Sequence, residues 1–490
     1  MEPTPPIEFG VPVENLSERL PTPPLVADDV LQELSAVCRS SRDTEQLAAH
    51  ARDWWPLAMH WALSGSVPAF PAIVMHPTTT LEVSRIASIC HRARVPLTVA
   101  GGRSGVSGAS VPARGGVVLD TTSLAGVTDV DVISGVVRAK PGTFGPDLEA
   151  HLAPLGLSVG HFPQSFELST VGGWIAARGA GQFSTRYGKI DDMVVGLEVV
   201  LADGTVVTTG TAPAAADGPD VASIFVGSEG TLGIITDVWL RAHPVAPHTA
   251  MAAYSLSSMG EGIELCRRVV RAGATPAVLR LYDATESQRS HGGDGSRCTL
   301  LVLDEGEVDL VGSTMAVVHR HAIALGARIE DTALVERWLE HRNDTSGLQA
   351  VTRKGYVVDT MEVAGSWSIL GRVYDDVRAA ITSVDGARSA SAHLSHSYLD
   401  GACLYFTFAG DKGRDAEALY VAMWNAGQRA ALAAGANLSH HHGVGLNRSR
   451  FVAEALGSSL GVLRAVKRAL DPHGILNPGK LGLDDEDVWP

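Results

Sequence analysis

Cysteine is scarce in this chain and forms no recognisable motif. Five cysteines occur in 490 residues, widely spaced and without a C-x-x-C pair: Cys38, Cys90, Cys266, Cys298 and Cys403. Their odd number and spacing exclude a disulfide framework and a cysteine-based zinc site. We therefore expect a cytoplasmic protein, kept in a reducing compartment, without a metal site.

Long apolar runs and an excess of basic residues are absent as well. No segment approaches the roughly 18 apolar residues that span a bilayer, and the proline-rich start, Met1 to Pro6, is unlike a secretory signal. The formal net charge is −15, which disfavours a nucleic-acid partner because such a partner needs a basic surface. We expect a small-molecule substrate and a homodimer, and peripheral membrane contact stays open.

The common nucleotide-binding fingerprints are missing from the segment richest in glycine. Residues 99–108 contain four glycines after a short apolar strand predicted for residues 96–100, and match neither G-x-G-x-x-G before a helix nor G-x-x-x-x-G-K-[ST]. Glycine permits positive φ angles that bring several N–H groups to one anion. The segment is therefore another type of phosphate loop or a flexible turn. Its candidate binding residues are Val99, Ala100, Gly101, Gly102, Arg103, Ser104, Gly105, Val106 and Ser107.

Segments rich in proline and glycine divide the chain into four predicted parts. Residues 1–66 form an N-terminal extended and helical segment, and residues 67–246 alternate short strands with helices. Residues 247–430 contain longer helical and strand segments typical of a separate domain. Residues 431–490 hold a histidine-rich loop and a helix that we expect to pack back on the second part.

Three local predictions can be compared directly with a structure. Leu81 to Arg94 has the spacing of an amphipathic helix, capped by Thr79 or Thr80. Asp131 to Ala139 alternates as a strand. Ser287 to Arg297 has no periodicity and is predicted to be a mobile loop.

Four further motifs follow the glycine-rich segment in order. They are residues 163–174 (PQSFELSTVGGW), 188–194 (GKIDDMV), 227–235 (GSEGTLGII) and 470–480 (LDPHGILNPGK). With the glycine-rich segment they resemble the FAD-binding domain of the vanillyl-alcohol oxidase superfamily. This resemblance implies an α+β fold: a two-subdomain PCMH-type FAD-binding domain, an α/β cap domain for the substrate, and a C-terminal helical segment that returns to the FAD domain.

The same resemblance implies FAD as the cofactor. The loop after Ala100 would then hold the FAD diphosphate through backbone N–H groups. Some relatives bind FAD covalently through a histidine in this loop, but residues 101–107 contain none, so we predict FAD that dissociates. Further residues implied to contact FAD are Pro163, Ser169, Thr170, Gly172, Gly173, Glu229, Gly230, Gly233, Ile234 and Ile235.

Three adjacent histidines at 440–442 reduce the number of functions to consider. Alone they are typical of an adventitious surface metal site or an exposed loop, and less often of acid, base or ligand groups at a functional site. The segment SHHHGVG at 439–445, together with residues 164–174, 279–283 and 397–406, is similar to the alkylglycerone-phosphate synthases. Those enzymes exchange the acyl group of acyl-dihydroxyacetone phosphate for a fatty alcohol, and their flavin N5 holds the substrate carbon without net redox change.

The resemblance also implies roles for single residues. Tyr398 would take a proton from the carbon next to the ester, and Arg280 would orient the substrate phosphate with its fork of donors. His440, His441 and His442 would act as acid or base and contact the flavin, with His441 and His442 foremost. Candidates for a second phosphate-binding residue are Arg337, Arg342 and Arg353.

Other interpretations stay open at this point. Tyr398 is also typical of a core or strand-edge residue, and His393 and His396 are pocket residues or exposed loop residues. Glu362 and Trp367 resemble a cap segment of the family. The protein could instead be an FAD-linked dehydrogenase of a 2-hydroxy acid or related alcohol, or a flavin-binding protein without catalysis.

Overall fold

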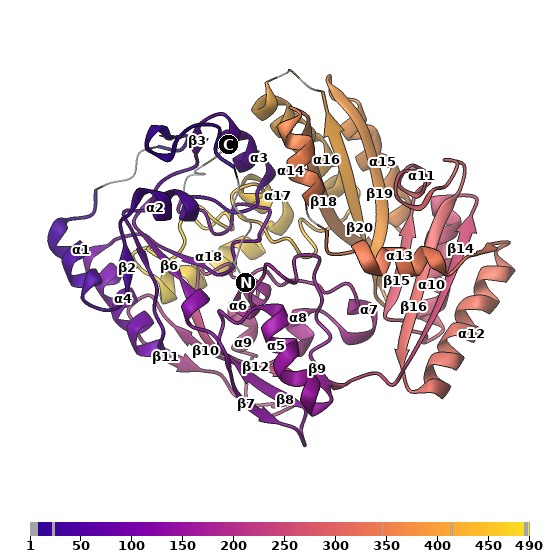
Figure 1. The fold of residues 1–490 in the computed structure, drawn as a ribbon, viewed down its shortest axis with the longest axis horizontal. Helices are drawn as coiled ribbons and strands as arrows, with labels where there is room; N and C mark the ends of the chain where they lie inside the picture. The colour runs from indigo at the N-terminus through magenta and orange to yellow at the C-terminus, as the bar shows by residue number, and fades with distance from the viewer. Residues whose placement is uncertain are drawn as a thin grey trace.

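The protein folds into two mixed helix-and-sheet regions, with a C-terminal segment that returns to the first. The computed structural model describes residues 8–21, 25–344, 346–411, 413, 415–484 and 489. In Figure 1 the chain builds the indigo and purple region, crosses to the pink and orange region, and ends in yellow elements beside the purple ones. The first helices are α1 Asp28–Ser35, α2 Thr44–His50 and α3 Pro56–Leu63.

A small sheet carries the glycine-rich loop. Its order is β2-β4-β6-β5, with β4, β6 and β5 parallel, and the loop leaves the carboxyl end of β5, where ligands of parallel sheets bind. Helix α4, Thr80–Ala93, begins with a capping box between Thr79 and Glu82, which confirms the predicted helix and cap. The strands are β2 Ser40–Ser41, β4 Ile73–Met75, β5 Leu97–Ala100 and β6 Val117–Asp120.

A second, antiparallel sheet has the order β11-β10-β12-β8-β7. The single strand predicted for residues 131–139 is wrong, because the chain forms the β7–β8 hairpin there. The Asp131 side chain accepts the N–H groups of Ile133 and Ser134 at 3.0 Å, and Gly135 takes a positive φ of 64°. The strands are β7 Val127–Asp131, β8 Val136–Ala139, β10 Val194–Val200, β11 Val206–Thr208 and β12 Ile234–Arg241.

Short helices pack on this second sheet around one apolar core. Val171 and Ile175 of α6 are fully buried there beside Leu197 and Val238 of the sheet. Leu463 and Val466, from the C-terminal helix α18, pack against the same core. The helices are α5 Gly145–Leu152, α6 Val171–Ala176, α7 Ser184–Tyr187, α8 Ile190–Met193, α9 Ala222–Phe225 and α18 Ser459–Leu470. Helix α17, Val452–Leu456, packs in a smaller apolar cluster with Phe451 and Leu460.

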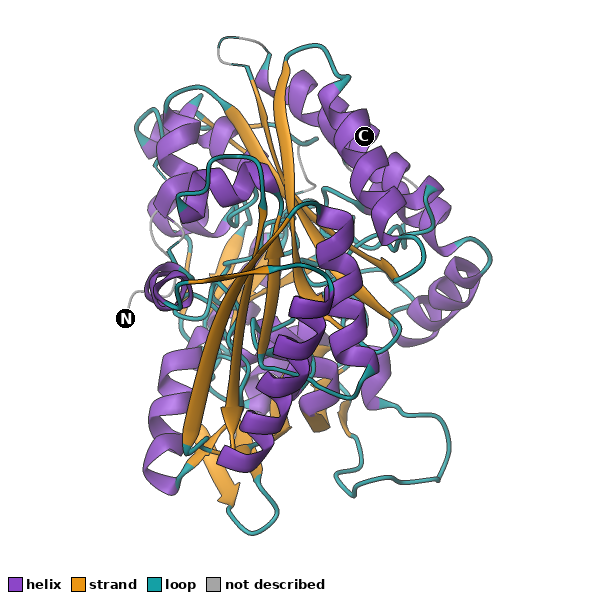
Figure 2. Cartoon of the chain, turned by 90° about the vertical axis from the view of Figure 1, so that its right-hand side faces the viewer, coloured by secondary structure: helices purple, strands orange, loops and turns teal. Residues whose placement is uncertain are grey.

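The third sheet is a seven-stranded antiparallel sheet with the order β17-β14-β16-β15-β19-β20-β18. Long helices line one of its faces, as Figure 2 shows edge-on, and share its apolar core. These helices are α10 Met259–Arg271, α12 Val308–Ala324, α15 Leu370–Thr382 and α16 Ala416–Ala433. The strands are β14 His248–Leu256, β15 Val278–Tyr282, β16 Cys298–Gly306, β17 Arg328–Glu330, β18 Val357–Ser366, β19 Ala387–Ser397 and β20 Gly401–Gly410.

Strand alternation places several polar side chains on the other face of this sheet. Leu279, Leu281, Met361, Val363, Leu404 and Phe406 belong to the helix-covered core. Their sequence neighbours therefore point to the opposite face, towards the first region. We call this the inner face, and it carries Arg280, Glu362, His393 and Tyr405.

The segment predicted to be a mobile loop, residues 287–297, is helical in its first half. Helix α11, Ala284–His291, continues to His291 and is capped by Asp283, whose side chain accepts the N–H of Glu286. The loop prediction is therefore wrong for residues 287–291. Among the described residues, no helix is both long and apolar enough to cross a bilayer.

Candidate active site

A cavity of about 440 Å³ lies between the glycine-rich loop and the inner face of the seven-stranded sheet. Most of the residues predicted from sequence line it: Val99, Gly101, Gly102, Arg103, Ser104, Gly105, Val106, Pro163, Ser169, Thr170, Gly172, Gly173, Glu229, Gly230, Gly233, Ile234, Ile235, Arg280, His441 and His442. Ala100 and Ser107 are buried beneath the loop, and Tyr398 and His440 lie behind the cavity wall.

The glycine-rich loop presents backbone donors to the cavity. In the described part of the chain, the N–H groups of Arg103, Ser104 and Gly105 have no protein acceptor. Arg103 takes a positive φ of 53°, which is uncommon for a residue with a side chain. Successive free N–H groups in such a turn form an anion-binding nest. The loop therefore fits a diphosphate.

A buried carboxylate anchors this loop from below. Asp120 accepts from His50 Nε2 at 2.8 Å and lies 3.6 Å from Nη1 of Arg103. Burial opposes ionisation, but the hydrogen bond from His50 and the charges of His50 and Arg103 lower the pKa of Asp120 to about 2. The Arg103 side chain is thereby held on the protein side of the loop, and its backbone is left to face the ligand.

The remaining wall offers polar atoms that the protein does not use. Trp54 Nε1, Thr170 Oγ1 and both ring nitrogens of His161 are buried without a hydrogen-bond partner among the described residues. Buried polar groups without partners are costly, so they indicate a ligand. A Cβ at Gly105 or Gly173 would meet no atom closer than 3.4 Å, and both residues line the cavity. The wall fits a flat cofactor with hydrogen-bonding edges.

We expect that Gly173→Leu weakens cofactor binding at least tenfold without unfolding the chain, because the new side chain fills the cavity wall. Gly312→Leu is the matched control, since Gly312 is also helical and has no neighbour within 4 Å of its Cβ position. Flavin fluorescence titration of the stripped protein measures both dissociation constants. Equal affinities in the two variants would contradict the placement of the cofactor.

A buried glutamate fixes the histidine loop, residues 438–445. Glu362 Oε1 accepts the N–H groups of His440, His441 and His442 at 3.2, 3.1 and 2.8 Å. The Arg448 guanidinium pairs with the same carboxylate, and both side chains are buried. Burial opposes ionisation, but the Arg448 and His442 charges hold the pKa of Glu362 well below its usual value.

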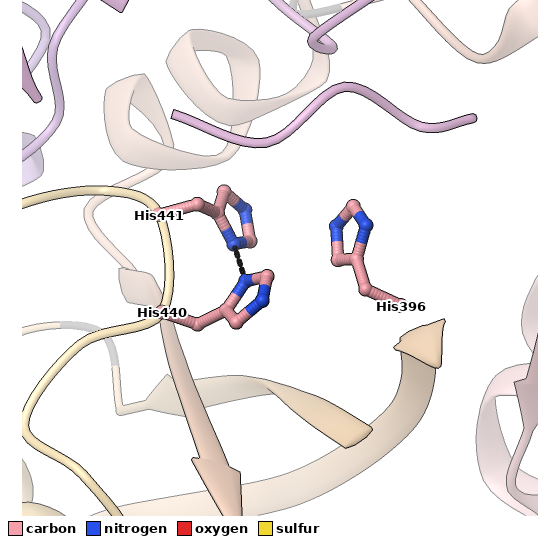
Figure 3. A group of neighbouring side chains, drawn as sticks. All are labelled: His396, His440 and His441. Atoms are coloured by element: carbon pink, nitrogen blue, oxygen red, sulfur yellow. Dashed lines mark hydrogen bonds between the residues drawn. The ribbon is translucent and has the colours of Figure 1, made fainter. Parts of the chain in front are cut away.

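Two histidines of this loop form a chain with Tyr398. The Tyr398 hydroxyl lies 2.7 Å from His440 Nε2, and His440 Nδ1 lies 2.8 Å from His441 Nδ1, the bond drawn in Figure 3. Lys189 Nζ donates to the His440 carbonyl at 2.7 Å and holds the backbone. The chain therefore connects Tyr398 with the cavity wall, where His441 lies.

All three groups of this chain are uncharged at neutral pH. Burial lowers the pKa of His440 to about 3 and holds the pKa of His441 well below its usual value. Burial raises the pKa of Tyr398. The hydrogen bonds can therefore run in either direction, depending on the tautomer of each imidazole.

Arg280 on β15 is held towards the cavity by side chains of the inner face. Its Nη2 lies 2.6 Å from His393 Nε2, and its Nε donates to the Tyr282 hydroxyl at 2.7 Å. His393 Nδ1 lies 2.8 Å from a Glu286 carboxylate oxygen. Burial and Arg280 lower the pKa of His393, so its neutral ring accepts from Arg280 and donates to Glu286. Arg280 Nη1 has no partner among the described residues, and this nitrogen can donate to an anion.

Of the three further arginines considered, Arg342 lies near Arg280. It bonds Gln182 Oε1 at 3.1 Å, and Gln182 lines the cavity. Burial and the charge of Arg280 lower the pKa of Arg342. Arg353 pairs with Glu8 instead, and Arg337 is exposed.

Four other residues of the site were undecided or missed at the level of sequence. His393 and His396 are buried on β19, so the exposed-loop interpretation is wrong for both. A register shift between Leu394 and His396 brings His396 beside His440, with ring centroids 4.9 Å apart. Glu362 and Arg448 position the histidine loop. The sequence feature that could have identified Glu362 is a glutamate between the core residues Met361 and Val363.

Comparisons with known proteins agree with this geometry. The family described as FAD binding domain matches residues 71–210, and the family described as FAD linked oxidases, C-terminal domain, matches residues 245–481. The FAD-linked oxidoreductase YgcU of Escherichia coli strain K12 is 31% identical over 84% of this chain and 89% of its own. The chain therefore belongs to the FAD-linked oxidoreductases, its cofactor is FAD, and its fold is a PCMH-type FAD-binding domain with a C-terminal domain.

Alkyldihydroxyacetonephosphate synthases are among the similar proteins. The one from Dictyostelium discoideum is 29% identical over 85% of this chain and 74% of its own. A solved structure of such a synthase has a TM-score of 0.81 and 25% identity, covering 96% of this chain and 88% of that one. p-Cresol methylhydroxylase shares the fold, with a TM-score of 0.72 and 17% identity over 94% of this chain and 99% of that one.

We expect FAD to be released when the protein is denatured, because residues 101–107 offer no histidine for covalent attachment. Acid precipitation followed by absorbance of the supernatant measures the released flavin. Flavin fluorescence that stays with the polypeptide on a denaturing gel would contradict the prediction and would first implicate His161, which lines the cavity without a hydrogen-bond partner.

Proposed function

We propose that the protein is an FAD enzyme of the alkylglycerone-phosphate synthase type. It would exchange the acyl group of an acyl-dihydroxyacetone phosphate for a fatty alcohol. The observation that carries the proposal is the uncharged chain from Tyr398 through His440 to His441, which reaches the same cavity as Arg280. The likeness to alkyldihydroxyacetonephosphate synthases over most of the chain supports it.

Arg280 would bind the substrate phosphate. Its guanidinium presents several N–H donors in a fixed plane, and the neutral His393 leaves its positive charge uncompensated at the cavity. Arg342 adds positive charge nearby. Bound FAD supplies the flavin ring at which the substrate carbon reacts.

The histidine chain would move a proton between the cavity and Tyr398. With His441 Nδ1 donating to His440 and His440 Nε2 donating to Tyr398, the remaining His441 nitrogen has a free lone pair and can accept a proton. With every hydrogen bond reversed, the same nitrogen carries a proton and can donate it. Proton uptake at His441 therefore becomes proton release from the Tyr398 hydroxyl to water, which its partly exposed side chain can reach, and the net charge of the chain does not change. Both the deprotonation of the substrate and the later return of a proton can use it.

Exchange of labelled hexadecanol into acyl-dihydroxyacetone phosphate tests this function. The FAD-loaded protein is incubated with both substrates without an electron acceptor. We expect a labelled ether-linked product and free fatty acid in equal amounts. Absence of the ether product under these conditions would overturn the proposal.

A second candidate is an FAD-linked dehydrogenase of a 2-hydroxy acid. It is favoured by the YgcU relative and by the mitochondrial D-lactate dehydrogenase [cytochrome] of Arabidopsis thaliana, which is 26% identical over 84% of this chain and 73% of its own. Arg280 would then bind the carboxylate, and His441 would take the hydroxyl proton. Anaerobic bleaching of the flavin by D-lactate, glycolate or D-2-hydroxyglutarate would establish this reaction. A protein that binds FAD and shows neither reaction would be a non-catalytic flavin binder.

A further inference from the structure

Three histidines meet at the cavity wall. His396 comes from β19, and His440 and His441 come from the histidine loop. One ring nitrogen of each lies within 4.8 Å of the others. Figure 3 shows the bonded pair of loop histidines with His396 beside them. His396 and His440 are buried, at 4% and 7% exposure, and both His396 and His441 line the cavity.

We propose that His396, His440 and His441 form a binding site for a divalent transition-metal ion, with Zn²⁺ as the representative ion. Three imidazoles with an open fourth position are a recurring zinc ligand set, and imidazole also suits Cu²⁺ and Ni²⁺. The cavity gives an ion a route to His441 and room for a water molecule as fourth ligand. The Glu362 carboxylate, paired with Arg448, holds the loop backbone beside the site.

Neighbouring side chains already select which ring nitrogens face the site. Ser184 Oγ lies 2.6 Å from His396 Nδ1, which leaves His396 Nε2 for a metal. Tyr398 occupies His440 Nε2, which leaves His440 Nδ1. Such outer contacts fix ring orientation in metal sites. His441 Nδ1 completes the set.

The distances require only a small adjustment. Zn–N bonds of about 2.0–2.1 Å in a tetrahedral site place the ligand nitrogens roughly 3.3 Å apart. The His440 and His441 Nδ1 atoms, now 2.8 Å apart, would separate by about half an ångström, and His396 would approach them. Small changes of χ1 and χ2 in these side chains cover such a shift, so the backbone need not move.

Metal binding would prevent proton transfer along the chain from His441 through His440 to Tyr398. An ion on both Nδ1 atoms replaces their hydrogen bond, and the His440 proton moves to Nε2, where it is donated to Tyr398. The Tyr398 hydroxyl then cannot pass its proton to His440. If the proposed function holds, Zn²⁺ therefore inhibits it. Metal binding itself is independent of that function and is measured separately.

Equilibrium dialysis with elemental analysis tests the site. The FAD-loaded full chain is stripped with a chelator and titrated with ZnCl₂. We expect one Zn²⁺ per chain, with affinity reduced at least a hundredfold in His396→Ala and in His440→Ala. His319→Ala, an exposed histidine on α12, is the control and should bind like the wild type. No stoichiometric zinc in the wild type, or unchanged binding in His396→Ala, would overturn the proposal.

Cobalt spectroscopy of the wild type tests the site even if the histidine variants misfold. Co²⁺ added to the wild type should give the visible absorption bands of a tetrahedral nitrogen site, read as a difference spectrum against the flavin. Ser184→Ala keeps all three ligands and should weaken binding about tenfold, since it removes only an outer contact. Octahedral bands, typical of surface coordination, would also overturn the proposal.

Discussion

Replacing Tyr398 with phenylalanine is expected to lower kcat roughly a thousandfold while leaving FAD bound. The substitution removes the hydroxyl that lies 2.7 Å from His440 Nε2 and so ends the proton chain. General acid–base groups typically contribute about 10²–10⁴-fold to rate. The ring itself stays in place, because Trp367 Nε1 bonds the Tyr398 carbonyl and not its hydroxyl. The exchange assay measures kcat, and the absorbance of the purified protein measures FAD content.

Tyr374→Phe is the matched control for this prediction. Tyr374 is a partly buried tyrosine whose hydroxyl donates to Asp283 at 3.2 Å, and it does not line the cavity. Loss of the Tyr374 hydroxyl should change kcat less than threefold. A Tyr398→Phe protein that has lost FAD would show that the tyrosine is structural. An unchanged rate with FAD bound would show that no proton passes through Tyr398.

The FAD region could be predicted because its function rests on backbone geometry. A run of glycines after a strand carries that geometry in the sequence itself, and Gly101, Arg103 and Gly105 line the cavity. The helix capped by Thr79 could be predicted for the same reason, because its capping residues are close together in the sequence. The hairpin at Asp131 was missed because its turn depends on one side chain accepting two N–H groups, which alternation of apolar residues does not reveal.

The histidine cluster could not be predicted because tertiary packing creates it. Tyr398 and His440 are adjacent only because the loop after α16 folds onto the inner face of the seven-stranded sheet. His396 reaches the cluster through a register shift in β19, and strict alternation would have placed it in the opposite direction. In the sequence Glu362 is one of several polar residues in β18, and its contacts with three successive N–H groups require the folded loop.

Glu362→Gln is expected to destabilise the protein by about 3–5 kcal/mol, because it leaves the Arg448 charge buried without its partner. The amide oxygen can still accept the loop N–H groups, so the loss isolates the charge pair. Glu362→Gln combined with Arg448→Met should recover most of this stability, since no unpaired charge then remains. Denaturant unfolding followed by circular dichroism measures all three proteins. A double variant as unstable as the single one would contradict the explanation.

Acid should reduce the difference between wild type and Glu362→Gln. The pKa of Glu362 lies well below its ordinary value of 4.5, so its ionised form stabilises the fold above that value. As the pH falls below about 4.5, the unfolded chain binds a proton that the folded chain does not, and the wild type loses this contribution. The glutamine variant has no such group to titrate. Its unfolding midpoint should therefore fall less steeply with pH, and parallel curves would show that Glu362 is not ionised in the fold.

The same substitution should also slow turnover more than the loss of stability explains. The neutral amide oxygen binds the three loop N–H groups more weakly than a carboxylate does, so His440 and His441 are held less firmly against Tyr398. Misplacement of catalytic groups by about 1 Å costs on the order of a hundredfold in rate. We expect that loss at a temperature where the variant is fully folded and loaded with FAD. Arg448→Lys keeps a positively charged side chain beside Glu362, so the carboxylate that binds three successive N–H groups stays ionised. This variant should therefore retain more activity than Glu362→Gln. Activity that instead followed folded fraction alone would assign Glu362 to stability and remove it from the positioning of the histidines.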